Sequence, residues 1–174
     1  MTRKIIVSAI LVSLLIVGAS ALTLTPRDVA PTVDGRVSQG EYPNFQSVDG
    51  IDFGASLSKE GILTLAVRAP TSGWVAVGLG SGFMDGSWIL MAYDYNGKKA
   101  FSEQLGISHF HRAVKDTKIL AKAVGHAGGM TTLEFQVKAS DFVQNGQLPV
   151  ILAYASAANF TSYHEMHSSL MLEF

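Results

Sequence analysis

Short runs in which apolar and polar residues alternate recur along most of the chain, separated by turns rich in glycine and asparagine. In the run 131–137, for example, Leu133, Phe135 and Val137 alternate with polar neighbours. A period of two places the apolar side chains on one face of a β-strand. No window keeps an apolar period of 3.6, and a single helical turn is expected near 140–144. The pattern therefore predicts an all-β domain.

Nine segments fit the pattern of a short strand: 50–58, 62–67, 74–79, 88–95, 99–103, 118–124, 131–137, 148–156 and 169–174. Asn96-Gly97 joins the fourth and fifth as a hairpin turn, because both central residues of a type I′ turn need positive φ. Short strands with regularly spaced turns are typical of a sandwich or a barrel. We expect an antiparallel β-sandwich.

The N-terminus has a different pattern. Arg3 and Lys4 precede an apolar run, 5–17, and Ala19-Ser20-Ala21 follows with the small residues that signal peptidase accepts. These three parts predict a cleavable signal peptide over 1–21. An uncleaved membrane anchor is the alternative, although the run is short for a span. The mature protein is therefore expected to be secreted, periplasmic or extracellular, or else anchored by this segment.

One domain is expected after the signal peptide. Pro26 and Pro31 discourage regular structure, so 22–32 is predicted to be a linker and 33–174 the β-sandwich domain. A chain of 174 residues is consistent with a single domain.

Composition removes several classes of function. The net charge is -1, which gives no reason to expect nucleic acid or an anionic membrane surface as a partner. The chain has no cysteine, so disulfides, thiolate metal sites and covalently attached haem are excluded. No Gly-x-Ser-x-Gly or His-Glu-x-x-His segment occurs, and the glycine-rich stretch 78–82 lacks the Lys-Ser/Thr of a phosphate loop. Independent catalysis is the least supported reading.

The histidines form two groups that a metal or a haem could use. His109 and His111 lie two apart, and in an extended segment both would point to the same side. His164 and His167 precede the last strand, and a difference in parity would turn them to opposite faces. Each alone fits an ordinary surface residue. A zinc or copper site using His109 and His111, with Asp116 or His164, is one alternative.

Met84 lies in a polar glycine loop instead of an apolar run. A methionine in such a loop either plugs a gap in packing or offers a soft thioether ligand. A thioether and an imidazole form one of the standard axial pairs of haem iron.

Several motifs resemble the DOMON family, the domains similar to the N-terminal domain of dopamine β-monooxygenase. The segment 71–93 resembles its core signature and reads Thr-Ser-Gly-Trp-Val-Ala-Val-Gly-Leu-Gly-Ser-Gly-Phe-Met-Asp-Gly-Ser-Trp-Ile-Leu-Met-Ala-Tyr. The opening Val-Asp-Gly-Arg-Val-Ser-Gln-Gly-Glu-Tyr at 33–42 and the Thr-x-x-Glu-Phe of 131–137 resemble bacterial members. The position after Met84 reads Asp85-Gly86-Ser87, where relatives often carry a second acid.

The resemblance implies an immunoglobulin-like β-sandwich and, as in several relatives, a b-type haem held by a methionine and a histidine without covalent bonds. Met84 matches the axial methionine. His164 matches the axial histidine by motif and is preferred, and His167 is the alternative by distance to the last strand. His109 or His111 could line the site.

The first functional hypothesis is therefore an extracytoplasmic haem protein that transfers single electrons to an unidentified redox partner, such as a membrane cytochrome or an oxidoreductase. The residues expected to wall the haem pocket, whose other role is sandwich core, are Trp74, Phe83, Trp88 and Tyr163. A module that binds carbohydrate or another small ligand without haem is the alternative.

Overall fold

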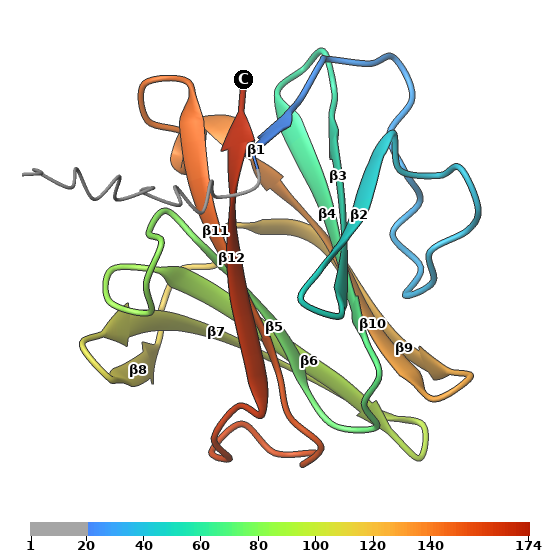
Figure 1. Ribbon diagram of the computed structural model, residues 1–174. Helices are drawn as coiled ribbons and strands as arrows, with labels where there is room; N and C mark the ends of the chain where they lie inside the picture. The colour runs from blue at the N-terminus through green and yellow to red at the C-terminus, as the bar shows by residue number, and fades with distance from the viewer. Residues whose placement is uncertain (1–20) are drawn as a thin grey trace, which may run out of the picture.

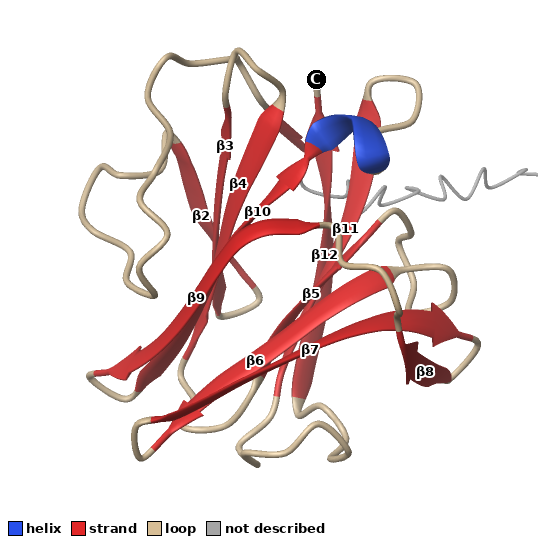
Figure 2. Cartoon of the chain, turned by 180° about the vertical axis from the view of Figure 1, so that it is seen from behind, coloured by secondary structure: helices blue, strands red, loops and turns tan. Residues whose placement is uncertain are grey.

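The strands form two β-sheets that face each other (Figures 1 and 2). The computed structural model describes residues 21–174. One sheet has seven strands in the order β1-β12-β11-β5-β6-β7-β8, and the other has five in the order β2-β3-β4-β10-β9. The predicted all-β sandwich is confirmed. The predicted signal peptide lies outside the described residues except for Ala21.

The first six strands are β1 (Ala21–Thr23), β2 (Asn44–Val48), β3 (Ile51–Leu57), β4 (Ile62–Ala69), β5 (Val75–Leu79) and β6 (Trp88–Tyr95). The remaining strands are β7 (Lys98–Ile107), β8 (Phe110–Ala113), β9 (Ile119–Ala127), β10 (Met130–Lys138), β11 (Gln147–Tyr154) and β12 (Met166–Glu173). The expected helical turn is a short 3₁₀ segment, η1 (Ala139–Asp141).

Neighbouring strands pair antiparallel, except that β1 runs parallel to β12. The β6–β7 hairpin closes on Asn96 and Gly97, whose φ angles are 52° and 76°. The hairpin turn predicted from this dipeptide is confirmed. The β6–β7 and β9–β10 hairpins end side by side at one end of the sandwich in both views (Figures 1 and 2).

The core lies between the sheets and consists of the inward-facing residues of the alternating strands. Phe53 and Phe135 are fully buried, and Trp88 packs against Phe135 and Phe142 with ring centroids 6.2 and 5.3 Å apart. Burial of these rings and of the leucines around them supplies most of the stabilising free energy of such a fold.

Three strands were not among the nine predicted. β2 (Asn44–Val48) and β8 (Phe110–Ala113) lie at sheet edges, and all four residues of β8 are exposed, so neither shows apolar alternation. β1 begins at Ala21, the last residue of the predicted signal peptide, and runs into the segment 22–32 that was expected to be a linker, and Leu24 after it is buried in the core. The start of that segment therefore packs on the sandwich.

Glu134 of β10 is a fully buried carboxylate that fixes the segment leading into the sandwich. Its Oε2 accepts hydrogen bonds from the backbone N–H groups of Asp34, Gly35 and Arg36 at 3.1, 2.8 and 3.1 Å. Its Oε1 accepts one from the Tyr42 hydroxyl at 2.8 Å. Burial raises the pKa of Glu134, and these hydrogen bonds oppose that rise. The two motifs at 33–42 and 131–137 therefore meet at one buried structural interaction.

Residues 21–174 include no helix that is both long and apolar enough to cross a membrane.

Replacing the Glu134 carboxylate is expected to destabilise the fold. Glu134→Gln places an amide N–H₂ against groups that donate hydrogen bonds, so the free energy of unfolding falls by about 2–4 kcal/mol. Tyr42→Phe removes one of the four bonds and costs less, about 1–2 kcal/mol. Urea denaturation measures both. Asp141→Asn, an exposed carboxylate, serves as the control, and an equal effect of all three variants contradicts the prediction.

Candidate functional site

The outer face of the seven-stranded sheet carries a second apolar cluster, separate from the core. Its buried members are Trp74, Ala76, Ile89, Met91 and Ala155. Most outward-facing residues of a sandwich are polar, because that face meets water. Here β5 and β6 bury apolar residues on both faces. An apolar outer face marks a place that something else covers, either the chain itself or a ligand.

Small residues keep this face flat. The pairing register aligns Ala153 of β11 with Ala76 of β5, and Ala76 with Met91 of β6. In the next row, Gly78 lies between Ile151 and Ile89, and a Cβ on Gly78 would come within 2.5 Å of the Ile151 side chain. The Ile151 side chain therefore covers Gly78, whereas the alanines at 76 and 153 add little above the sheet.

Met84 packs onto the cluster from the loop between β5 and β6 and is half-buried. Backbone bonds fix this loop: Ser87 N–H donates to the Met84 carbonyl at 3.1 Å, and Gly106 N–H donates to the Ser87 carbonyl at 2.8 Å. Asp85 accepts a hydrogen bond from the Ser108 N–H at 2.6 Å. The thioether is therefore held over the sheet by a loop that is tied to β7 and the turn after it.

The loop approaches β7 at Gly106 so closely that a side chain there would overlap the Met84 carbonyl. Gly82, in the same loop, has no neighbour within 4 Å of its Cβ position. The approach of the loop therefore requires a glycine at 106 but not at 82.

His164 and His167 lie at the other side of the same face. His167 belongs to β12 and pairs with Ala153, which packs against the apolar cluster. His164 precedes the strand, and its ring contacts the His167 ring edge-on at 4.8 Å. The two rings are in contact and do not face opposite sides as strand parity predicted, because β12 begins only at Met166 and strand alternation does not govern residue 164.

His164 is the more enclosed of the two rings. It is half-buried, it stacks on Tyr163 at 4.2 Å, and its Nδ1 is buried without a hydrogen-bond partner. Burial, with a smaller contribution from His167, lowers the pKa of His164 and so favours its neutral form. A neutral imidazole with an unpartnered nitrogen is suited to coordinate a metal.

The aromatic residues predicted to wall a pocket have different environments. Trp74 is buried in the outer cluster, and its Nε1 donates to Ser162 Oγ at 2.8 Å. Phe83 precedes Met84 in the sequence and Tyr163 precedes His164. Their side chains are 80% and 82% exposed. Trp88 lies in the core between the sheets, on the face opposite to Ala76 and Met91. It therefore has the alternative role stated above, that of a sandwich core residue.

His109 and His111 do not form a metal site with other residues. His109 lies in the turn between β7 and β8, so the two residues do not share an extended segment. His111 of β8 pairs with Gly106, beneath the Met84 loop. Within residues 21–174, no group of three or more His, Cys, Asp or Glu side chains could hold a metal ion. The zinc or copper alternative gains no support.

Sequence reasoning missed two residues that organise this face. Gly106 carries no motif, and its role depends on a contact between strand β7 and the Met84 loop. Glu165 accepts hydrogen bonds from the backbone and side chain of Ser156 and so ties the ends of the loop before β12 together. The only indication in the sequence was that a hydrogen-bond acceptor, the Glu165 carboxylate, directly follows His164.

Gly106→Ala is expected to displace the Met84 loop, because a Cβ has no room against the Met84 carbonyl. Shifts of the amide resonances of 81–87 and a loss of about 1–3 kcal/mol in the free energy of unfolding are the expected results. Gly82→Ala adds the same methyl group into open space, so it leaves the free energy of unfolding and the amide resonances of 85–87 unchanged. Unchanged resonances in Gly106→Ala contradict this packing.

In the protein without added ligand, the pKa of His164 is expected below its usual value of about 6.5. The neutral ring then contributes stability that is present above pH 6.5 and is lost as the pH falls through the pKa of the folded state. His167→Gln removes the neighbouring charge and raises the pKa of His164. An NMR titration of the imidazole C–H resonances measures both, and a midpoint above 6.5 in the unaltered protein rules the account out.

No family model matches the sequence, and no curated protein matches it. Solved structures that share its fold include two cytochrome domains. The cytochrome b domain of pyranose dehydrogenase from Coprinopsis cinerea is 13% identical, with a TM-score of 0.56 over 71% of this chain and 76% of that one. The cytochrome domain of Myriococcum thermophilum cellobiose dehydrogenase is 14% identical, with a TM-score of 0.50 over 74% and 77%. The chain therefore has the β-sandwich fold of these cytochrome domains, which agrees with the DOMON-type fold that its motifs predict.

Proposed function

We propose that this domain binds a b-type haem on the outer face of the seven-stranded sheet and transfers single electrons outside the cytoplasm. The observation that carries the proposal is the apolar outer face, with a thioether at one side and a pair of imidazoles at the other. Ala76 and Ala153 would leave apolar surface for a macrocycle between the thioether and the imidazoles. The absence of cysteine from the sequence means that the group is held without covalent attachment.

Met84 and His164 would hold the haem iron. His164 is preferred over His167 because it is more enclosed, has a buried unpartnered Nδ1 and favours its neutral form. Iron held by a thioether and an imidazole transfers electrons and has a raised reduction potential. His167 packs against the His164 ring and limits its orientation.

The surrounding residues position these ligands and exclude water. Trp74 is fixed by its bond to Ser162, so that its ring and Ala155 close one end of the face. Gly106 allows the Met84 loop to approach the sheet. Phe83 and Tyr163 are exposed and would cover the ring edges only after the group binds.

The structural neighbours support the same general kind of function. Both are cytochrome domains of dehydrogenases, one of them named as a cytochrome b domain. By analogy, the redox partner here is an oxidoreductase or a membrane cytochrome. The predicted signal peptide agrees with a protein that is exported, either secreted or kept in the periplasm.

Haem reconstitution tests the proposal. The mature domain is expected to take up one equivalent of haem and to give low-spin visible spectra in both oxidation states. Met84→Ala loses the low-spin bands, and so does His164→Ala, whereas His167→Ala keeps them.

Met130→Ala, which alters a methionine remote from the outer cluster, is the matched control and keeps the spectrum. Circular dichroism establishes that each variant is folded. A folded domain that takes up no stoichiometric haem contradicts the proposal, and loss of the bands in His167→Ala alone reassigns the ligand.

A further inference from the structure

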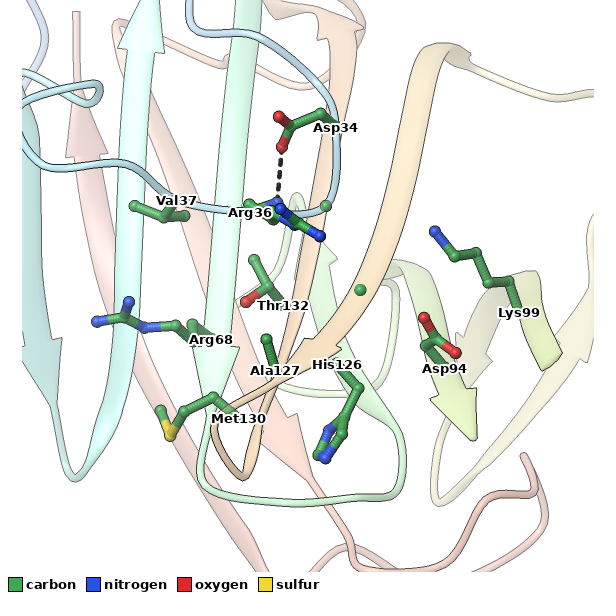
Figure 3. A pocket seen from close by; sticks show the side chains of 12 residues that line it. Asp34, Arg36, Val37, Arg68, Asp94, Lys99, His126, Ala127, Met130 and Thr132 are labelled. Atoms are coloured by element: carbon green, nitrogen blue, oxygen red, sulfur yellow. Dashed lines mark hydrogen bonds between the residues drawn. The ribbon is translucent and has the colours of Figure 1, made fainter. Parts of the chain in front are cut away.

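A polar pocket of about 520 Å³ lies at the end of the sandwich where the β6–β7 and β9–β10 hairpins finish (Figure 3). Its walls are the segment 34–37, the β9–β10 hairpin and the paired residues Asp94 and Lys99. It shares no lining residue with the outer apolar cluster, and no aromatic side chain lines it. Its volume is within the usual range of small-molecule sites.

We propose that this pocket binds a small hydroxycarboxylate, a molecule that carries one carboxylate and several hydroxyl groups. The proposal is independent of haem. It rests on two cations without ion pairs, two hydrogen-bond acceptors and a rigid frame.

The cations are Arg36 and Lys99, which lie on opposite sides of the pocket (Figure 3). Neither forms a salt bridge with another described residue. Arg68, also in the lining, is instead bound to Asp52 at 2.7 Å and points away from the other two. An arginine and a lysine that face a cleft from two sides fit a carboxylate, because charge-assisted hydrogen bonds are the strongest these groups make.

The acceptors are Asp94 and His126, whereas the Asp34 carboxylate in the same lining accepts a hydrogen bond from the Arg36 backbone N–H at 2.8 Å. Thr131 Oγ1 donates its single hydrogen to the Thr71 carbonyl at 2.7 Å. The contact of 3.1 Å between His126 Nδ1 and the same oxygen therefore requires Nδ1–H to be the donor. The neutral His126 ring then keeps its lone pair on Nε2, which can accept a hydrogen bond from a ligand. Two acceptors beside two cations match hydroxyl groups next to a carboxylate.

The frame of the pocket is fixed before any ligand binds. The buried Glu134 holds the backbone of Asp34, Gly35 and Arg36. Gly35 and Gly125 pack backbone to backbone, and a Cβ on Gly125 would come within 2.5 Å of the Gly35 carbonyl oxygen. Little ordering is then needed on binding, which favours affinity.

Three six-carbon probes test the proposal on the mature domain by NMR titration and calorimetry. Gluconate carries both kinds of group, sorbitol carries only hydroxyls and hexanoate carries only a carboxylate. We expect gluconate to bind and to shift the resonances of His126 and of the Lys99 amide. Sorbitol and hexanoate are expected to bind at least about tenfold more weakly, because each lacks one set of hydrogen bonds.

Variants localise the binding. Arg36→Gln and Lys99→Gln each weaken gluconate binding by about tenfold or more. Lys98→Gln, the exposed neighbour on the same hairpin, leaves it unchanged. Backbone spectra confirm that each variant is folded. Equal binding of gluconate and hexanoate, gluconate binding that survives both pocket variants, or no saturation at millimolar gluconate overturns the proposal. None of these outcomes depends on haem uptake.

Discussion

Burial of apolar side chains on both faces of β5 and β6 links this fold to its candidate function. A strand at the middle of a sandwich needs only one apolar face to build the core. Here Val75, Val77 and Leu79 face the core, and the residues between them face outward into a second apolar cluster. Apolar side chains on the outer face are unfavourable in water unless loops or a ligand cover them. The Met84 loop and the His164 segment are positioned at that second face.

The other organising interaction is the buried carboxylate of Glu134, which acts at the opposite sheet. It satisfies three consecutive backbone N–H groups and a tyrosine hydroxyl, so its own burial is compensated by hydrogen bonds. As a result, the backbone from Asp34 to Arg36 is fixed by hydrogen bonds, although it has no regular secondary structure. The motif at 33–42 therefore has a structural role. The same fixed backbone forms one wall of the polar pocket.

The apolar alternation predicted the strands of the core well, because residues such as Phe135 are dictated by burial alone. It could not predict β8 or β2, whose residues are exposed or partly exposed and are ordered by pairing with neighbours. Met84 and the two C-terminal histidines were identified from motif and chemistry. Their position on one face of the sheet could not be predicted from the sequence, because His164 lies in a loop where no strand periodicity applies. Trp88 illustrates the same limit: its type suits either face of the sheet, and only the register with Leu79 places it in the core.

X-ray absorption at the iron edge of the haem-loaded domain tests the central claim most directly, because it reports which atoms bind the metal. The account predicts one sulfur neighbour of the iron, which disappears in Met84→Ala while the domain stays folded. Iron surrounded only by nitrogen and oxygen neighbours in the unaltered protein would contradict the assignment of Met84 and the proposed role of its loop.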